Sequence, residues 1–171
     1  MKLFPFRWFF RREEPPIVPP SSMGIKSVPG TTMKYVAFPQ PPMAPYAYAS
    51  RCYQKNMDAA LAEELKQCGP SVFMLVAADE TRVLVQNHQG KQKLDRATIH
   101  EISLHPVLPA KGSGMIILFF EVHQNGQLES QDFIMCPPYD LKLQEWCHKK
   151  AEEVAALLNV PFKITEPSYD C

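Results

Sequence analysis

The chain has 171 residues, of which 46% are hydrophobic, and its 18 basic and 18 acidic residues leave it with no net charge. This balance argues against general affinity for nucleic acid or anionic membrane, because both depend on summed positive charge. The length fits one compact domain with a tail.

The cysteines and the apolar runs indicate a soluble, cytoplasmic protein. Five cysteines form no Cys-x-x-Cys pair, which fits neither a disulfide framework nor a zinc site. The aromatic N-terminus is interrupted by Pro5 and Arg7 and makes a poor signal peptide. The longest apolar run, MIILFF at residues 115–120, is far shorter than the ~20 residues of a membrane-spanning helix.

The first part of the chain is rich in proline, with 10 of the 17 prolines at or before Pro45. Because proline lacks a backbone donor, we expect residues 1–32 to form a flexible arm. The tip of the arm, LFPFRWFFRR, is aromatic and basic and could rest on a membrane surface or dock on a partner. A mobile arm with incidental aromatic residues is the alternative.

A strand, a helix and a series of strands follow the arm. Residues 33–38, MKYVAF, favour a strand, and residues 56–69 favour a helix capped by Asn56. From Ser71 the apolar period changes to that of strands, and turn residues divide the stretch up to residue 136 into six of them. The Asn-Gly pair at 125–126 is a hairpin signal.

The last predicted element is a long amphipathic helix at residues 140–159, with a cap at Asp140 and a stop at Asn159 before Pro161. Consecutive strands without intervening helices favour an α+β fold with two packed sheets or a partly open antiparallel barrel, which this helix closes.

The sequence lacks the motifs of common enzymes, with no G-x-G-x-x-G, P-loop or H-E-x-x-H. His100 and His105 are five apart on a predicted strand, so they should lie on opposite faces and share no metal. Cys147 and His148 are helix neighbours that do not face each other, and Cys147 reads as core. Three carboxylates are expected at strand ends, where solvated charges are ordinary: Glu121, Glu129 and Asp132. We therefore expect no enzyme, no metal and no cofactor.

The segment TIHEISLHPV, residues 98–107, resembles the strand of phosphotyrosine-binding (PTB) domains that starts near V-H-E-I-S, particularly those of the Disabled type. Residues 33–38 are similar to the first PTB strand, residues 56–69 to the helix after it, and residues 140–159 to the C-terminal helix. Pleckstrin-homology (PH) domains share the barrel and closing helix but lack the first helix. The resemblance implies a PTB-like barrel of about seven strands over residues 33–161, followed by a tail at residues 162–171.

The resemblance also implies a non-enzymatic adaptor that binds a short peptide between the fifth strand and the C-terminal helix. An edge strand exposes unpaired N–H and C=O groups, which an extended peptide can satisfy as an added strand. The implied strand positions are Ile99, His100, Glu101, Ile102, Ser103, Leu104 and His105, and the implied helix positions are Trp146, Lys150, Val154 and Leu157.

Alternation along the implied strand predicts two faces. His100, Ile102 and Leu104 should point inward, and Glu101, Ser103 and His105 should point to the other face, where Ile99 is an exception to the polar pattern. Packing in the core is the alternative for the aliphatic helix positions. The indole N–H of the tryptophan needs a hydrogen-bond partner, so this residue suits either the core or the binding groove.

We expect ligand binding to be independent of phosphate, because phosphate recognition needs an arginine cluster and the candidate cations show no such clustered arrangement in the sequence. These candidates are Arg51, Lys91, Lys93 and Arg96. The rival interpretation is a PH-like module that binds phosphoinositides or scaffolds a larger complex.

The tail, ITEPSYDC, is similar to the N-P-x-Y ligands of PTB domains. Pro167 and Tyr169 keep the spacing, and Ile164 stands five residues before the tyrosine, but Glu166 replaces the asparagine that caps the turn. We therefore hypothesise that the tail occupies the domain's own groove or that of a neighbour. A disordered polar end is the alternative.

Overall fold

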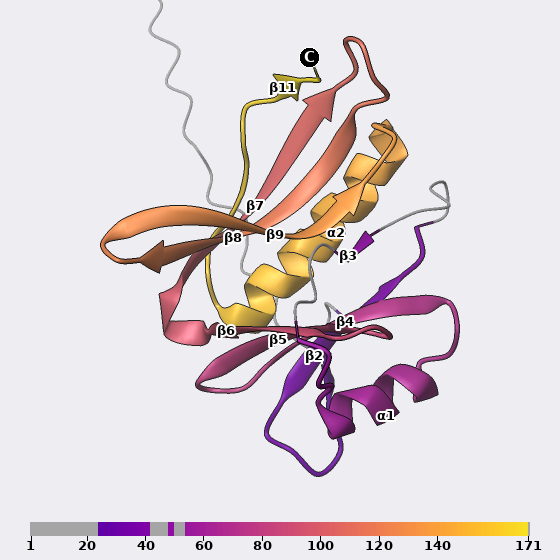
Figure 1. Ribbon diagram of the computed structural model, residues 1–171, viewed down its shortest axis with the longest axis vertical. Helices are drawn as coiled ribbons and strands as arrows, with labels where there is room; N and C mark the ends of the chain where they lie inside the picture. Colours follow the sequence, from indigo (N-terminus) through magenta and orange to yellow (C-terminus); the bar gives the residue numbers. More distant parts are fainter. Residues whose placement is uncertain (1–23, 42–47, 50–53, 171) are drawn as a thin grey trace, which may run out of the picture.

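The computed structural model describes residues 24–41, 48–49 and 54–170, and these form an α+β fold of two sheets and two α-helices (Figure 1). The predicted arm up to residue 23 lies outside the described residues. The ordered fold begins before the predicted boundary at Met33, because a short strand at Lys26–Ser27 pairs with the next strand and Val28 is buried.

The first sheet has five antiparallel strands in the order β1-β2-β4-β5-β6. Their bounds are β1 Lys26–Ser27, β2 Lys34–Pro39, β4 Val72–Ala78, β5 Arg82–Asn87 and β6 Lys91–Asp95. Helix α1, Ala59–Gln67, covers the outer face of this sheet, where its Leu61 and Leu65 are buried. The cap of α1 is Asp58 and not the predicted Asn56, because the Asp58 carboxylate accepts the N–H groups of the helix's first turn.

The second sheet follows the order β10-β7-β8-β9-β3, and β11 also pairs with β7. Its strands are β3 Tyr48–Ala49, β7 Ile99–Leu108, β8 Met115–Gln124, β9 Gln127–Cys136, β10 Phe162–Ile164 and β11 Ser168–Tyr169. The hairpin between β8 and β9 turns at Asn125 and Gly126, whose φ angles of 52° and 77° confirm the predicted Asn-Gly turn.

The six predicted strands divide between the two sheets, with β4 to β6 in the first and β7 to β9 in the second. A 3-10 turn at Arg96–Thr98 sends the chain from the first sheet into the second, and the described strands close no barrel. The Arg96 guanidinium holds this corner, donating to the carbonyls of Asp79 at 2.5 Å and of Leu158 at 3.3 Å. The Arg96 side chain therefore links the turn after β4 to the C-terminal end of α2 and is engaged in the fold.

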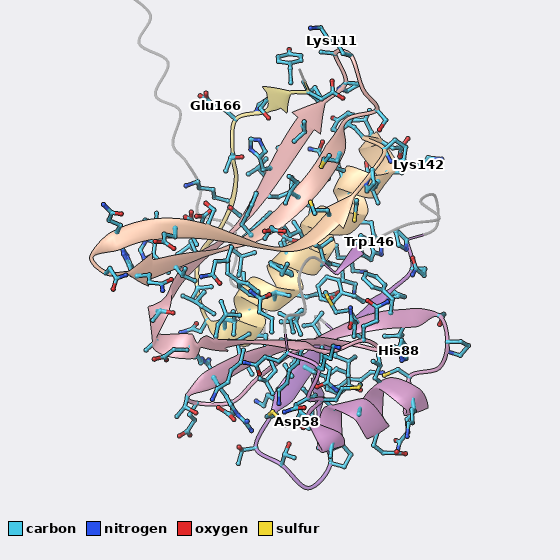
Figure 2. The ribbon with its side chains drawn as sticks, in the orientation of Figure 1. Asp58, His88, Lys111, Lys142, Trp146 and Glu166 are labelled. Atoms are coloured by element: carbon cyan, nitrogen blue, oxygen red, sulfur yellow. The ribbon has the colours of Figure 1, made fainter. Side chains whose placement is uncertain are left out.

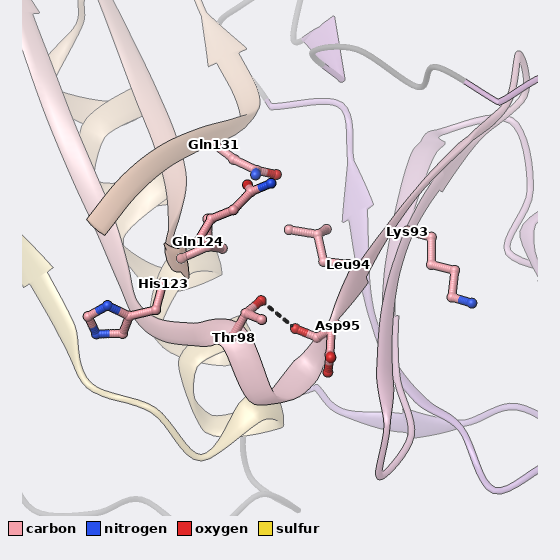
Figure 3. Close-up of a pocket in the computed structure, with 8 residues that line it drawn as sticks. Lys93, Leu94, Asp95, Thr98, His123, Gln124 and Gln131 are labelled. Atoms are coloured by element: carbon pink, nitrogen blue, oxygen red, sulfur yellow. Dashed lines mark hydrogen bonds between the residues drawn. The ribbon is translucent and has the colours of Figure 1, made fainter. Parts of the chain in front are cut away.

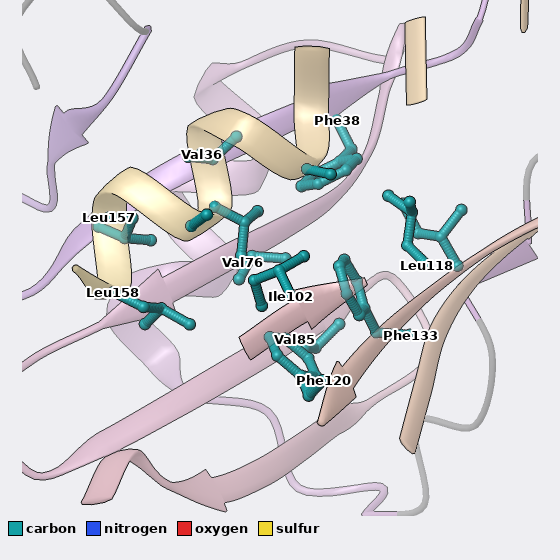
Figure 4. Close-up of a cluster of buried hydrophobic side chains, with 14 of the residues drawn as sticks. Val36, Phe38, Val76, Val85, Ile102, Leu118, Phe120, Phe133, Leu157 and Leu158 are labelled. Atoms are coloured by element: carbon teal, nitrogen blue, oxygen red, sulfur yellow. The ribbon is translucent and has the colours of Figure 1, made fainter. Parts of the chain in front are cut away.

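The main core lies where both sheets meet helix α2, Leu141–Leu158 (Figure 4). Val36 and Val76 come from the first sheet, Ile102 from the second and Leu157 from α2. The α+β class and the C-terminal helix are confirmed, since α2 starts at the predicted Asp140 cap and ends at Asn159 in the left-handed region, with φ 54°.

Asp140→Ala is expected to lower the free energy of unfolding by about 1 kcal/mol, because the Asp140 carboxylate accepts the N–H groups of Lys142 at 2.8 Å and Leu143 at 3.2 Å. Urea denaturation followed by circular dichroism measures the change. Glu145→Ala, at an exposed position of the same helix, is the control and should stay within about 0.5 kcal/mol. Equal losses in both variants would contradict the capping role.

Candidate functional site

The outer edge of β7 carries the chain's own C-terminal segment, defined here as residues 161–170. Strands β10 and β11 of this segment run parallel to β7, with Phe162 in register with Ile102 and Tyr169 in register with Leu108. In Figure 1 the segment leaves the end of α2 and follows β7 to its far end. An extended stretch of chain is therefore bound to this edge as an added strand.

Main-chain hydrogen bonds hold the segment to β7. The Ile102 N–H donates to the Pro161 carbonyl at 2.9 Å, and the Thr165 N–H donates to the Leu104 carbonyl at 2.9 Å. Further along, the Asp170 N–H donates to the Leu108 carbonyl at 3.1 Å. The even-numbered residues of β7 thus turn their backbone groups outward, and the odd-numbered ones face β8.

Pro106 explains why the segment pairs in two short pieces. By the same alternation its nitrogen faces the segment, and proline has no N–H to offer there. Between β10 and β11 the segment also contains Pro167, which lacks a donor as well. A proline is tolerated inside β7 because this side of the strand is an edge.

His105 holds the segment by its side chain. Its Nδ1 lies 2.6 Å from the Thr165 hydroxyl, and its Nε2 lies 2.8 Å from the Ser168 hydroxyl. The ring also packs edge-on against Phe119, with centroids 6.4 Å apart. The imidazole therefore recognises two hydroxyls three residues apart on the segment.

Asp170 is bound by the loop between β7 and β8. Its carboxylate accepts the N–H groups of Ala110, of Lys111 at 3.0 Å and of Gly114 at 2.8 Å. The N–H groups of Ala110 and Gly114 lower the pKa of Asp170 from 3.8 to about 2. Because this pKa is depressed, the carboxylate stabilises the bound segment above pH 3.8, and that contribution is lost as the pH falls through about 2.

A charged pair anchors the other end of the segment. Lys163 donates to Glu101 at 2.9 Å, and this hydrogen bond raises the pKa of Lys163. Glu101 is in register with Glu121 on β8, so the lysine offsets two neighbouring negative charges. Glu121 is buried and accepts the hydroxyls of Ser103 at 2.5 Å and Ser130 at 2.6 Å, so the expectation of a solvated charge at a strand end is wrong for it.

The alternation predicted along β7 fails at its start. His100 is exposed and Ile99 is buried, the reverse of the prediction, because a β-bulge shifts the register between Ile99 and Glu101. Beyond the bulge, Ile102 and Leu104 are buried, and Ser103 is buried as well because it lies against Glu121. Sequence alternation could not reveal a bulge that only the pairing with β8 creates.

The predicted helix positions do not line the edge of β7. Val154 and Leu157 are buried in the main core. Trp146 packs edge-on against Phe38 of β2 at 6.1 Å, and the Lys150 ammonium lies 5.8 Å from the same ring. Figure 2 shows Trp146 on α2 well away from Glu166 on the segment.

One helix residue that meets the segment is His148, whose ring lies 5.0 Å from that of Phe162. It is two residues from Trp146, which places the two side chains on roughly opposite sides of α2. His148 Nε2 also lies 3.3 Å from the carboxylate of Glu152, four residues further along α2. In the sequence this spacing predicts only a pair on the helix surface.

The N-P-x-Y-like motif lies on the β7 edge with two exposed side chains. Ile164 is 45% exposed and Tyr169 is 63% exposed. The side chains that hydrogen-bond to His105 and to the loop after β7 are those of Thr165, Ser168 and Asp170. The sequence reasoning missed these three residues, and the glycines of the KGSG turn were the only local signal for their loop.

No family model, curated protein or solved structure matches this chain.

A cavity of about 300 Å³ lies apart from the bound edge, between β6 and the β8–β9 hairpin (Figure 3). Its lining includes Lys93, Thr98 and Gln131, and the Thr98 hydroxyl is tied to the Asp95 carbonyl at 2.8 Å. Of the three candidate cations within the described residues, Lys93 is the one that lines this cavity. Arg51 lies outside the described residues.

In the described part of the chain, no helix is long and apolar enough to span a membrane, and no group of three or more metal-binding side chains comes together. Cys147 is fully buried, as predicted, and its hydrogen bond with Cys136 together with burial raises the pKa of its thiol.

Proposed function

We propose that the chain is a non-enzymatic adaptor or scaffold module with a PTB-like fold that holds a short, extended segment of a partner protein on the outer edge of β7. The proposed ligand is a short, linear, N-P-x-Y-like peptide that binds by strand addition, and its binding is phosphate-independent. The proposed setting is the cytoplasm.

The supporting observation is the occupied edge itself. The N–H of Ile102 and the carbonyls of Leu104 and Leu108 are all paired with an extended segment. Backbone pairing of this kind supplies affinity for any extended peptide, and neighbouring side chains supply selectivity. A partner that binds there replaces the C-terminal segment.

A selection of peptides on the full-length chain tests the proposal. Random peptides displayed on phage are selected on the wild type and on Thr165→Pro. This variant removes the N–H that donates to the Leu104 carbonyl and the hydroxyl that contacts His105, and it leaves β7 intact. We expect Thr165→Pro to bind selected peptides roughly 30-fold more tightly, the equivalent of about 2 kcal/mol for two hydrogen bonds. NMR should show the bound peptides shifting the amide signals of Ile102 and Leu104.

Ile164→Pro is the matched control, because the N–H of Ile164 points away from β7 by alternation. It should leave peptide affinity near that of the wild type. Selected peptides that leave the β7 amides unchanged would refute the proposal. Binding to phosphoinositide liposomes in place of peptides would favour the PH-like module.

A further inference from the structure

The loop at residues 109–114 is shaped to receive a carboxylate. Three of its N–H groups converge on the Asp170 carboxylate, which is the arrangement of an anion-binding nest. Gly112 leaves the space for it, since a Cβ at this position would lie 2.5 Å from Asp170 Oδ2. Gly114 has φ +65°, and a Cβ there would lie 2.5 Å from the Val107 carbonyl oxygen, so the turn requires glycine.

This loop is also fixed from outside the segment. The Tyr139 N–H, just before α2, donates to the Ser113 carbonyl at 3.0 Å. The loop conformation therefore has support that does not come from Asp170. A site whose donors are already oriented loses less entropy when its ligand binds.

The loop and His105 together read a pattern on the bound segment. His105 contacts hydroxyls at positions 165 and 168, and the loop contacts the acid at position 170. A carboxylate accepts several N–H groups at once, whereas an asparagine amide would present its own donors to some of them. The pattern is a hydroxyl, a second hydroxyl three residues later, and a carboxylate two residues after the second hydroxyl.

We infer that the β7 edge selects extended, acidic segments that carry this pattern, and that residues 165–170 are the chain's own occupant, which a partner segment of the same chemistry replaces. This inference rests on the proposed function and adds the identity of the ligand's recognised groups. Its central contact is a carboxylate on the 109–114 loop.

The first experiment tests the contact within the full-length chain. Asp170→Asn removes the charge, and Gly112→Ala displaces the carboxylate from the loop side without changing the segment. Hydrogen exchange of the Thr165 and Asp170 amides should speed up at least about fivefold in both variants. Glu166→Gln is the control, because it makes the same charge change at an exposed carboxylate that takes part in none of the described hydrogen bonds, and exchange should stay unchanged.

The second experiment supplies the segment from outside. The fluorescent peptide ITEPSYDS has the sequence of residues 164–171 with serine in place of Cys171. This peptide, and an analogue with asparagine in place of its aspartate, are each titrated onto full-length Asp170→Asn, whose loop is intact. The aspartate peptide should bind at least about tenfold more tightly, as the loss of a hydrogen bond to a charged group predicts. Adding Gly112→Ala to the chain should abolish this preference, and the wild-type chain should bind the aspartate peptide more weakly than Asp170→Asn does.

Equal affinity for the two peptides, or no shift of the β7 amides by either at millimolar concentration, would overturn the inference. Peptides selected from the phage library would still report on the proposed function. If they bind β7 without preferring an acid, the proposed function holds and the inference fails. If none binds β7, both fail.

Discussion

Ile102→Asp is expected to unfold the domain. Ile102 is fully buried in the main core, where the second sheet meets α2. The substitution loses the apolar burial of isoleucine and places an unpaired carboxylate among aliphatic and aromatic side chains. An uncompensated buried charge costs about 3–5 kcal/mol, which is much of the total stability of about 5–15 kcal/mol of an ordinary domain.

Far-UV circular dichroism and thermal melting of the purified variant measure the effect. We expect no cooperative transition, or a large drop in the melting temperature. His100→Asp is the control, because it puts the same carboxylate on the same strand at an exposed position. A variant at position 102 that melts as cooperatively as this control would show that Ile102 is not in the core.

Ser103→Pro is expected to unfold or severely destabilise the domain. A proline would be tolerated here only if the N–H of residue 103 faced the outer edge of β7. The Ser103 N–H points toward β8, where Phe119 is its register partner, so proline breaks the central ladder of the second sheet. The change also removes the hydroxyl that donates to buried Glu121 at 2.5 Å. The two losses together cost roughly 3–6 kcal/mol, at about 1.5–3 kcal/mol for each unsatisfied group.

Ser103→Ala separates the two contributions. It keeps the backbone N–H and removes only the hydroxyl, and Glu121 retains the Ser130 hydroxyl at 2.6 Å. We expect a loss of about 1.5–3 kcal/mol from this variant in urea denaturation. A Ser103→Pro protein as stable as Ser103→Ala would mean that the N–H of residue 103 is not part of the ladder.

The Ile102→Asp and Ser103→Pro variants distinguish the core side of β7 from its outer edge. Substitutions at Thr165 or Asp170 change only the segment side and should leave the melting transition cooperative. A loss of peptide binding in a folded variant would therefore report on the edge, and not on the stability of the sheet behind it.

Local chemistry made several elements predictable. The long helix was recognised from its apolar period, its Asp140 cap and its stop at Asn159, and the β8–β9 hairpin from its Asn-Gly pair. Each of these features depends on residues within a few positions of one another, so the sequence alone displays it. The burial of Ile102, Leu104 and Cys147 follows from the same periodicities.

The candidate site was predicted only as far as its strand. The resemblance implied β7 as an edge with Trp146 beside it, and the alternation placed His100 inside. The error at His100 arises from a bulge, and the error at Trp146 from the direction in which α2 faces the first sheet. Neither of these depends on neighbours in the chain.

The sequence by itself determined the α+β class and the C-terminal helix, because period, caps and turn residues act locally. The edge role of the strand at residues 99–105 was implied only by the family resemblance. Only the tertiary structure decided how the strands divide between two sheets, and that residues 161–170 fill the edge of β7. The physical reason is that strand addition is made by backbone N–H and C=O groups, which nearly every residue carries, so the sequence does not mark its partner.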